Sequence, residues 1–214
     1  MMDVLREEDP HASVSGWQNS GGEVSSMRMM NGHAFKEWSV VCAALARGKQ
    51  TLILRKGGIE DGSDGIRVEN PEFWLYPTYL HQESHKLAEG SEAVPAALSS
   101  SSHSRVSLQY YAVVYRADFI ATEVELARLQ KFHIWPSKTI VERFHYRRPG
   151  IWSLIVRIYE RPQPYELVQD EQMAGCRTWV DLPEELSTAG LTPVLSDHDF
   201  QIKVDEIEHR YEER

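Results

Sequence analysis

A lysine followed by two glycines is the first group of residues in this chain that could bind a ligand. Lys56 ends a predicted strand over residues 50–56, and Gly57 and Gly58 follow it directly. A lysine ammonium beside the backbone N–H groups of a glycine turn suits an anion. A solvated lysine before a hairpin turn has the same sequence, so both interpretations stay open. The spacing of a nucleotide P-loop does not occur in the sequence.

Two histidines stand at the ends of predicted elements, where loops present side chains. His81 comes shortly after Pro77, and His133 precedes Ile134. Because imidazole titrates near neutral pH, both are candidate catalytic residues. His133 at a helix end also fits a purely structural role. His81 and His85 are four residues apart, but no third ligand is evident, and we predict no metal site and no cofactor.

The densest group of basic and aromatic residues contains Arg143, Tyr146, Arg147 and Arg148. Arginine binds phosphate with two parallel hydrogen bonds, and a tyrosine ring stacks on a nucleobase. The three arginines are therefore candidate ligand-binding residues. A solvated turn between a helix and a strand has the same composition, and the sequence alone favours that plainer interpretation.

The two cysteines, Cys42 and Cys176, are too few for the disulfide framework of a small secreted protein. We interpret both as reduced thiols in a reducing compartment. Cys176 stands next to Arg177, which would lower a thiol pKa and favour a nucleophile. A buried structural cysteine in a strand is the alternative.

Hydrophobic periodicity predicts the elements that must position these groups. We predict helices over residues 33–48, 78–86, 122–132, 137–144 and 196–213, and strands over 50–56, 73–76, 106–119, 152–159 and 176–182. Phe35, Trp38 and Cys42 would share one face of the first helix, and Thr122 with Glu125 forms a capping box. Helices and strands do not alternate regularly, which favours an α+β fold.

The chain is expected to form a single α+β domain over residues 33–214, with mostly antiparallel strands and flanking helices. Residues 1–32 lack an apolar period and are predicted to be a disordered arm. Residues 88–105, rich in Ala, Ser and Glu, are predicted to be a flexible loop, and 60–72 and 162–175 are shorter loops. Trp38 and Trp152 are expected in the core.

The charge of the chain limits its partners. The net charge is −9, and the excess of acids lies in residues 1–32 and 196–214. This balance argues against a general polyanion binder but permits a local basic site. The sequence holds no apolar run near the roughly 20 residues that span a bilayer, and no signal pattern. We therefore expect a cytoplasmic protein without a membrane partner.

Five strings resemble the bacterial family catalogued as domain of unknown function 1802. They are residues 33–38, 54–59, 75–82, 132–135 and 175–179, which read HAFKEW, LRKGGI, LYPTYLHQ, FHIW and GCRTW. The resemblance covers roughly residues 33–183. The family has no established activity, but some members are reported beside restriction-type nuclease domains, which implies a link to nucleic acid. The Asp and Glu-x-Lys pattern of such a nuclease is not found in this sequence.

A second likeness is to the ASCH group of PUA-like RNA-binding barrels. Their motif, Gly-x-Lys-x-x-Glu-x-Arg, lies at a helix-to-strand junction. Gly48 and Arg55 match it at such a junction, whereas Gln50 and Ile53 replace the lysine and the glutamate. The likeness implies a PUA-like barrel as a candidate fold.

Three functions remain open from the sequence. The first is a nucleic-acid-associated binding module, which rests on Lys56, the Arg143–Arg148 cluster and the two resemblances. The second is a small enzyme acting on a phosphorylated ligand through Lys56, His81 and His133 around one pocket. The third is a structural protein that binds a protein partner through its acidic C-terminal helix.

Overall fold

A computed structural model describes residues 17–18, 27–56, 60–62, 65–67, 70–78, 105–169, 173 and 177–212 of the chain. The helices are α1 Ser39–Ala46, α3 Glu123–Arg128, the 3-10 helix η2 Gln130–Phe132, α4 Ser137–His145 and α5 Asp197–Glu212. The strands of the main sheet are β1 Trp17–Gln18, β2 Met30–Trp38, β3 Leu52–Arg55, β6 Glu72–Thr78, β7 Arg105–Ile120, β8 Ile151–Val168, β9 Trp179–Ser187 and β10 Thr192–Pro193. A separate hairpin joins β4 Glu60–Gly62 and β5 Gly65–Arg67.

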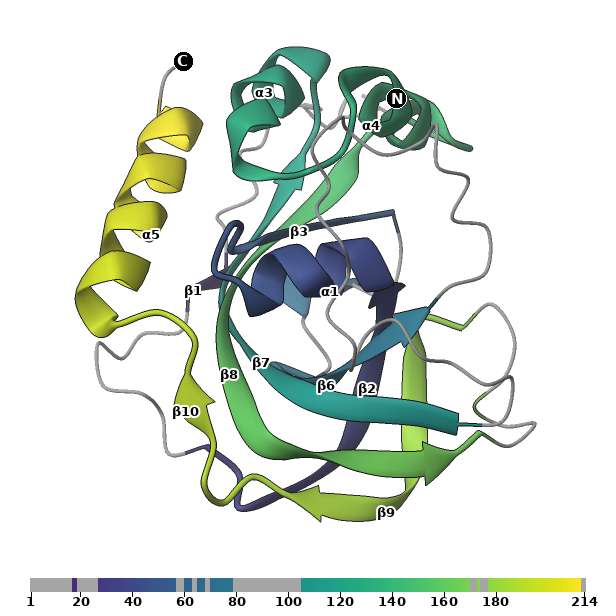
Figure 1. Cartoon of the computed structure of the whole chain (residues 1–214). Coiled ribbons are helices and arrows are strands. Elements are labelled where there is room, and N and C mark those ends of the chain that lie inside the picture. Colours follow the sequence, from purple (N-terminus) through teal and green to yellow (C-terminus); the bar gives the residue numbers. More distant parts are fainter. Residues whose placement is uncertain are drawn as a thin grey trace, which may run out of the picture.

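The main sheet is mostly antiparallel and strongly curved. Its order is β10-β8-β7-β6-β2-β9, with β1 paired to β7 and β3 paired to β8, and only β2 and β6 run parallel among the described strands. The two longest described strands, β7 and β8, pair along most of their length (Figure 1). The single α+β domain with flanking helices is therefore confirmed.

The sheet is not closed into the barrel that the ASCH likeness implied. Among the described strands, β9 pairs with β2 alone and β10 pairs with β8 alone. Side chains link the far half of β8 to the end of β9 instead. The Tyr165 hydroxyl and the Arg161 guanidinium each donate to the carbonyl of Ser187, both over 3.1 Å.

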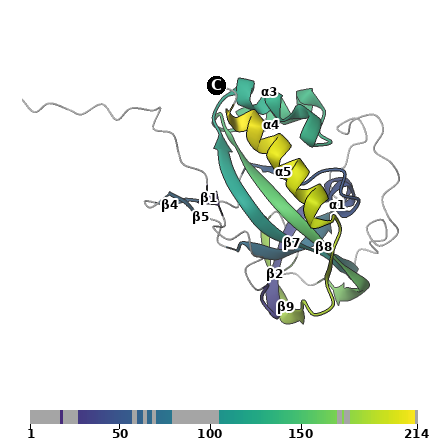
Figure 2. The same cartoon turned by 90° about the vertical axis from the view of Figure 1, so that its left-hand side faces the viewer.

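Each face of the sheet carries its own apolar cluster. Alternate residues of β6 point to opposite faces, as a strand requires. Phe73 and Leu75 join the larger cluster, which lies under the helices, whereas Trp74 and Tyr76 join the smaller one. In Figure 2, α5 runs across the β7–β8 ladder, and α3 and α4 lie at one end of it. The larger cluster thus holds the helices on the sheet.

The helix predicted over residues 33–48 is wrong in its first part. Residues up to Trp38 form β2, and the helix begins only at Ser39. β2 lies between β6 and β9, so both of its backbone edges are hydrogen-bonded. The Phe35 ring packs on Phe73 and Trp179, with ring centroids 4.9 and 4.8 Å apart. Tertiary pairing therefore overrides the helical spacing of the apolar residues.

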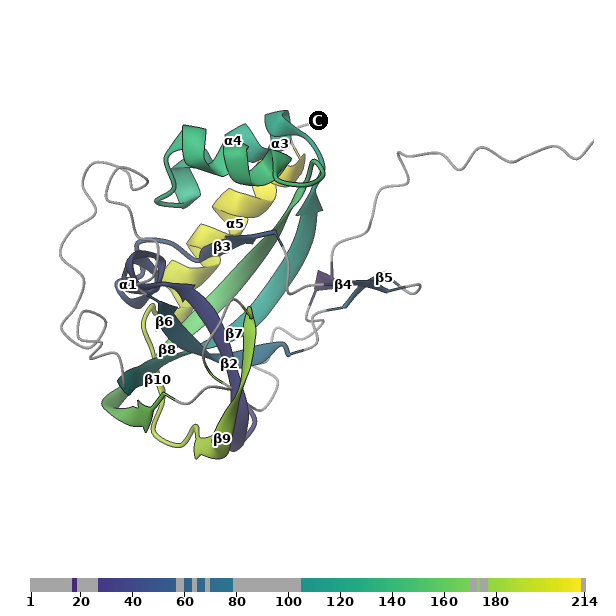
Figure 3. The ribbon, with the colours of Figure 1, turned by 90° about the vertical axis from the view of Figure 1, so that its right-hand side faces the viewer.

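Three further boundaries differ from prediction. β8 continues to Val168 through the loop expected over 162–175, because Pro162 and Pro164 fall between its paired segments, at a register shift. The β4–β5 hairpin lies inside the loop expected over 60–72 and forms a separate two-stranded sheet beside β1 (Figure 3). β9 covers 179–187 instead of 176–182.

Other expectations are confirmed or lie outside the described residues. The strand over 106–119, the helices over 137–144 and 196–213 and the capping box of Thr122 and Glu125 are all present. Trp152 is buried, whereas Trp38 is partly buried against the core. Thr78 belongs to β6, and the remainder of the helix expected over 78–86 lies outside the described residues. So does the loop expected over 88–105, except for Arg105, which begins β7.

Candidate functional site

Lys56 lies just beyond β3 and holds the chain that leaves helix α4. Its ammonium donates to the main-chain carbonyls of Phe144, at 2.7 Å, and of Arg148 and Gly150. An ammonium has three protons, so these acceptors occupy all of its donors. Desolvation and the Arg148 charge lower the pKa of Lys56. Lys56 therefore binds main-chain carbonyls within residues 144–150, and these contacts fix the conformation of the turn that follows α4.

The turn after α4 presents three side chains to solvent. Tyr146 is 59 % exposed, and Arg147 and Arg148 are exposed as well. Arg147 has φ of 66°, the one positive value at a non-glycine residue in the described part of the chain. Such a conformation costs about 1 kcal/mol or more, and strain of this kind gathers at functional sites. The Arg147 guanidinium lies 5.2 Å from the Tyr146 ring centroid.

Gly150 completes this turn with φ of 115°. A Cβ atom at this position would lie 2.2 Å from the Phe119 ring, so only glycine fits. The turn is thus fixed at both ends, by the carbonyl contacts of Lys56 and by the close packing of Gly150. We define the basic turn as residues 146–150.

Arg143 lies on the last turn of α4 and points inward from the basic turn. Its guanidinium carbon is 3.9 Å from the Trp135 ring centroid and 5.1 Å from that of Trp38. The two indole rings pack edge to face, with centroids 4.9 Å apart. The pKa of Arg143 is lowered, because desolvation outweighs the opposite effect of the Glu37 carboxylate.

Glu37 is a buried carboxylate at the end of β2. It accepts from the backbone N–H of Trp38 at 2.8 Å and lies 3.5 Å from the Arg55 guanidinium. Arg55 also donates to the Thr178 hydroxyl at 3.0 Å. Arg55, Glu37 and Arg143 form a group of charges beside two tryptophans. We refer to these three residues, together with Trp38 and Trp135, as the arginine–tryptophan cluster.

His133 is buried and neutral. Its Nδ1 accepts the backbone N–H of Trp135 at 3.1 Å, and burial lowers its pKa to about 4. Its Nε2 has no hydrogen-bond partner among the described residues. The geometry gives His133 a structural role at the turn before α4.

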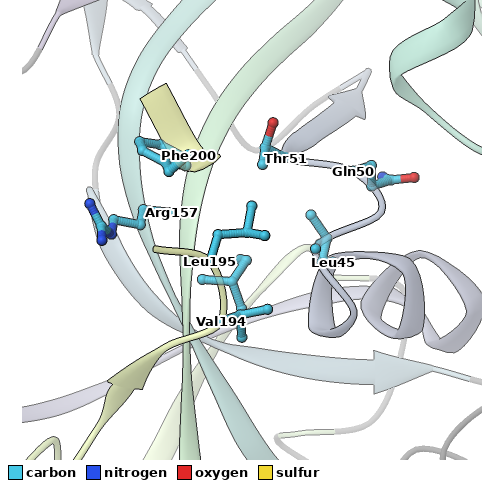
Figure 4. Close-up of a pocket in the computed structure, with 9 residues that line it drawn as sticks. Leu45, Gln50, Thr51, Arg157, Val194, Leu195 and Phe200 are labelled. Carbon is cyan, nitrogen blue, oxygen red and sulfur yellow. The ribbon is translucent and has the colours of Figure 1, made fainter. Parts of the chain in front are cut away.

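The pocket expected around Lys56, His81 and His133 is not assembled by the described residues. His81, Gly57 and Gly58 lie outside them, as does Cys176. The cavity in Figure 4 is lined by Leu45, Gln50, Thr51, Arg157, Val194, Leu195 and Phe200, with Gly48 and Ile158. Its volume of about 10 Å³ has room for one water at most. Neither Lys56 nor His133 reaches it.

The described residues offer neither a metal site nor a membrane span. They contain no group of three His, Cys, Asp or Glu side chains that could hold a metal ion. Cys42 is a free, buried thiol, and burial raises its pKa. Within the described part of the chain, no helix is long and apolar enough to cross a membrane.

The C-terminal helix α5 covers the sheet through Phe200, Val204 and Ile207, which are buried. Its acidic side chains lie on the remaining faces, and the Glu208 carboxylate pairs with Arg116 at 3.1 Å. Partner binding through this helix stays a prediction.

The family described as "Domain of unknown function (DUF1802)" matches residues 34–206. The chain belongs to this family. The DUF1802 region starts within β2 and extends past residue 183, where the resemblance in the sequence ended, into α5. It therefore includes the arginine–tryptophan cluster and the basic turn. The family description gives no activity.

Two solved structures are similar to this DUF1802 chain. They are the ASCH protein of Zymomonas mobilis and a serine-to-alanine variant of it, with TM-scores of 0.38 and 0.39 and identities of 13 % and 12 %. The alignments cover 81 % of this chain and 93 % and 94 % of the other chains. No curated protein matches the chain.

The sequence pattern identified Arg143 but not the residues that hold it. The apolar spacing predicts a helix at Glu37 and Trp38, where the structure has the end of β2, and Trp135 stands out only in the string FHIW. Arg55 stands out in the sequence only as a match to the ASCH motif. The glutamate between the aromatic residues Phe35 and Trp38 is a signal that could have indicated this cluster, because a buried charge requires a partner.

Proposed function

We propose that this protein is a binding module for single-stranded nucleic acid, with the basic turn as its contact surface. The observation that carries the proposal is the clamp of Lys56 on the turn, which leaves Tyr146, Arg147 and Arg148 exposed together. An aromatic ring for base stacking beside arginines for phosphate is the usual composition of a single-strand site.

The preorganised backbone supports the proposal. A turn fixed before binding loses less conformational entropy when the ligand arrives. The positive φ of Arg147 gives its side chain a direction that helical or extended backbone would not give. Lys56 stabilises this conformation by donating a hydrogen bond to the Arg148 carbonyl.

The overall charge of the protein predicts modest affinity with strong salt dependence. A chain with net charge −9 repels a polyanion except at the basic turn. Binding should therefore require low ionic strength and weaken steeply as salt is added. The enzyme alternative receives less support, because Lys56 and His133 are engaged in structural contacts.

A fluorescence anisotropy titration tests the proposal. The probe is a fluorescein-labelled oligothymidylate of about 12 nucleotides, within the usual site size of a single-strand binder. The variant Arg147→Ala/Arg148→Ala should weaken binding at least about tenfold and reduce the salt slope by about 1.4, because two phosphate contacts are lost. Tyr146→Ala should weaken binding through lost stacking, with little change in salt slope.

The matched control is Arg47→Ala/Arg105→Ala, which removes the same charge from two exposed positions outside the turn. It should bind with nearly the affinity of the wild type. The proposal fails if the wild-type protein does not bind at low salt at roughly 100 µM, the weak end of non-specific affinity. It fails equally if the two double variants lose the same affinity.

A further inference from the structure

Arg143 differs from Arg116 and Arg55, two other partly buried arginines of this fold. Arg116 pairs with Asp118 and Glu208, and Arg55 pairs with Glu37 and Thr178. Arg143 contacts two tryptophan rings, but it donates no hydrogen bond to an acceptor among the described residues. Within the described part of the chain, its five N–H donors therefore have no acceptor, although the side chain is partly buried.

The Arg143 guanidinium lies over the Trp135 ring, a contact that does not use its hydrogen-bond donors. A centroid distance of 3.9 Å places the planar group against the face of the indole. Stacking uses the faces of a guanidinium, whereas its hydrogen-bond donors point outward in its plane. A stacked arginine thus presents a rigid fork that fits two oxygens of one phosphate.

The charge of the arginine–tryptophan cluster also indicates the ligand. Arg55 and Arg143 carry two positive charges, and Glu37 carries one negative charge. The described cluster therefore has a net charge of +1 in a partly buried environment. An uncompensated buried charge is costly, and a group with one negative charge would balance it. A phosphodiester carries one negative charge, whereas a terminal phosphate carries closer to two.

The cluster is connected to the basic turn through the end of α4. Lys56 contacts the carbonyls of Phe144, next to Arg143, and of Arg148 in the turn. The two features are therefore parts of one rigid unit.

We propose that Arg143, supported by Trp38 and Trp135 and assisted by the charge of Arg55, binds a phosphodiester of the strand whose neighbouring nucleotides contact the basic turn. This inference rests on the proposed function and adds to it a residue that selects phosphodiester geometry. Arg147 and Arg148 contribute charge at the surface, whereas Arg143 requires its planar fork.

The test compares Arg143→Lys with Arg143→Gln, using the same labelled oligothymidylate. Lysine keeps the charge but loses the fork, so Arg143→Lys should weaken binding about tenfold with an almost unchanged salt slope. Arg143→Gln should weaken it further and lower the slope by about 0.7, the value for one lost phosphate contact. Thermal melting of each variant shows whether it is folded.

A second measurement observes binding directly in the folded wild-type protein. In ¹H–¹⁵N spectra, the Nε–H signal of Arg143 is assigned by its disappearance in Arg143→Lys. It should shift when unlabelled oligothymidylate is added, whereas the signal of exposed Arg105 should stay in place.

The outcomes separate the inference from the proposed function. If the wild type binds and Arg147→Ala/Arg148→Ala weakens binding, but both Arg143 variants bind like the wild type, the inference is wrong and the proposed function stands. An Arg143 signal that does not move at saturation leads to the same conclusion. If the wild type does not bind the oligonucleotide at all, both fall together.

Discussion

The Lys56 ammonium lies 2.7 Å from the main-chain carbonyl oxygen of Phe144, which joins the end of strand β3 to the end of helix α4. The last carbonyls of a helix have no partner within the helix and favour a nearby cation. Lys56 satisfies this carbonyl and two that follow it in the turn. A residue that the sequence suggested as a ligand contact is thus a support for the residues that face solvent.

Replacing Lys56 should destabilise the protein, in contrast to a lysine that only contacts a ligand. We expect Lys56→Ala to lower the free energy of unfolding by about 1–3 kcal/mol, because partly buried carbonyls lose a charged donor. Urea denaturation measures this. Lys138→Ala, which removes an exposed lysine of α4, should leave the urea midpoint within error. Equal midpoints for the two variants would exclude the support role of Lys56.

His133 should make stability depend on pH in the mildly acidic range. Its folded pKa of about 4 lies below the ordinary 6.5, so the unfolded chain takes up a proton that the fold excludes. The free energy of unfolding should therefore fall as pH decreases from 6.5 towards 4, by up to about 3 kcal/mol in total from this group. Above pH 6.5 the contribution is constant.

The variant His133→Gln isolates this effect. The difference in unfolding free energy between wild type and variant, measured by urea denaturation at several pH values, should shrink as pH falls through that range. A wild-type curve parallel to that of His133→Gln would show that His133 is protonated equally in both states.

Asn31 should mark the beginning of the folded domain. Its amide donates to the Glu72 carbonyl and to the Tyr111 hydroxyl, both over 2.8 Å, and it is buried. Asn31→Ala should cost about 1–3 kcal/mol, because buried polar groups lose their partner. A chain that starts at residue 27 should melt like the full-length protein, whereas one that starts at residue 32 should melt several degrees lower. Similar melting of both chains would move the boundary back to the predicted residue 33.

Cys42 should be inert to thiol reagents while the protein is folded. Its side chain is fully buried, and burial raises its pKa, so little thiolate is available for reaction. In Cys176→Ser, which leaves Cys42 as the single thiol, DTNB should react slowly in buffer and rapidly in denaturing urea. Fast labelling in buffer would mean that helix α1 opens readily.

Local patterns determined several elements correctly from the sequence alone. The capping box of Thr122 and Glu125 fixes the start of α3, because the side chain and backbone of each residue satisfy those of the other. The apolar spacing of Phe200, Val204 and Ile207 fixes the inner face of α5. In both cases the decisive interactions join residues close together in the chain, so the sequence contains all the necessary information.

The tertiary structure decided the remainder. Residues 33–38 form a strand because β6 and β9, far away in the chain, supply its hydrogen-bond partners. The roles of Lys56 and Arg143 likewise depend on acceptors and rings that arrive from other elements. The residue type of each was visible in the sequence. Long-range packing determines whether a cation donates its hydrogen bonds to the backbone, as Lys56 does, or has donors available for a ligand. No local sequence pattern encodes that packing.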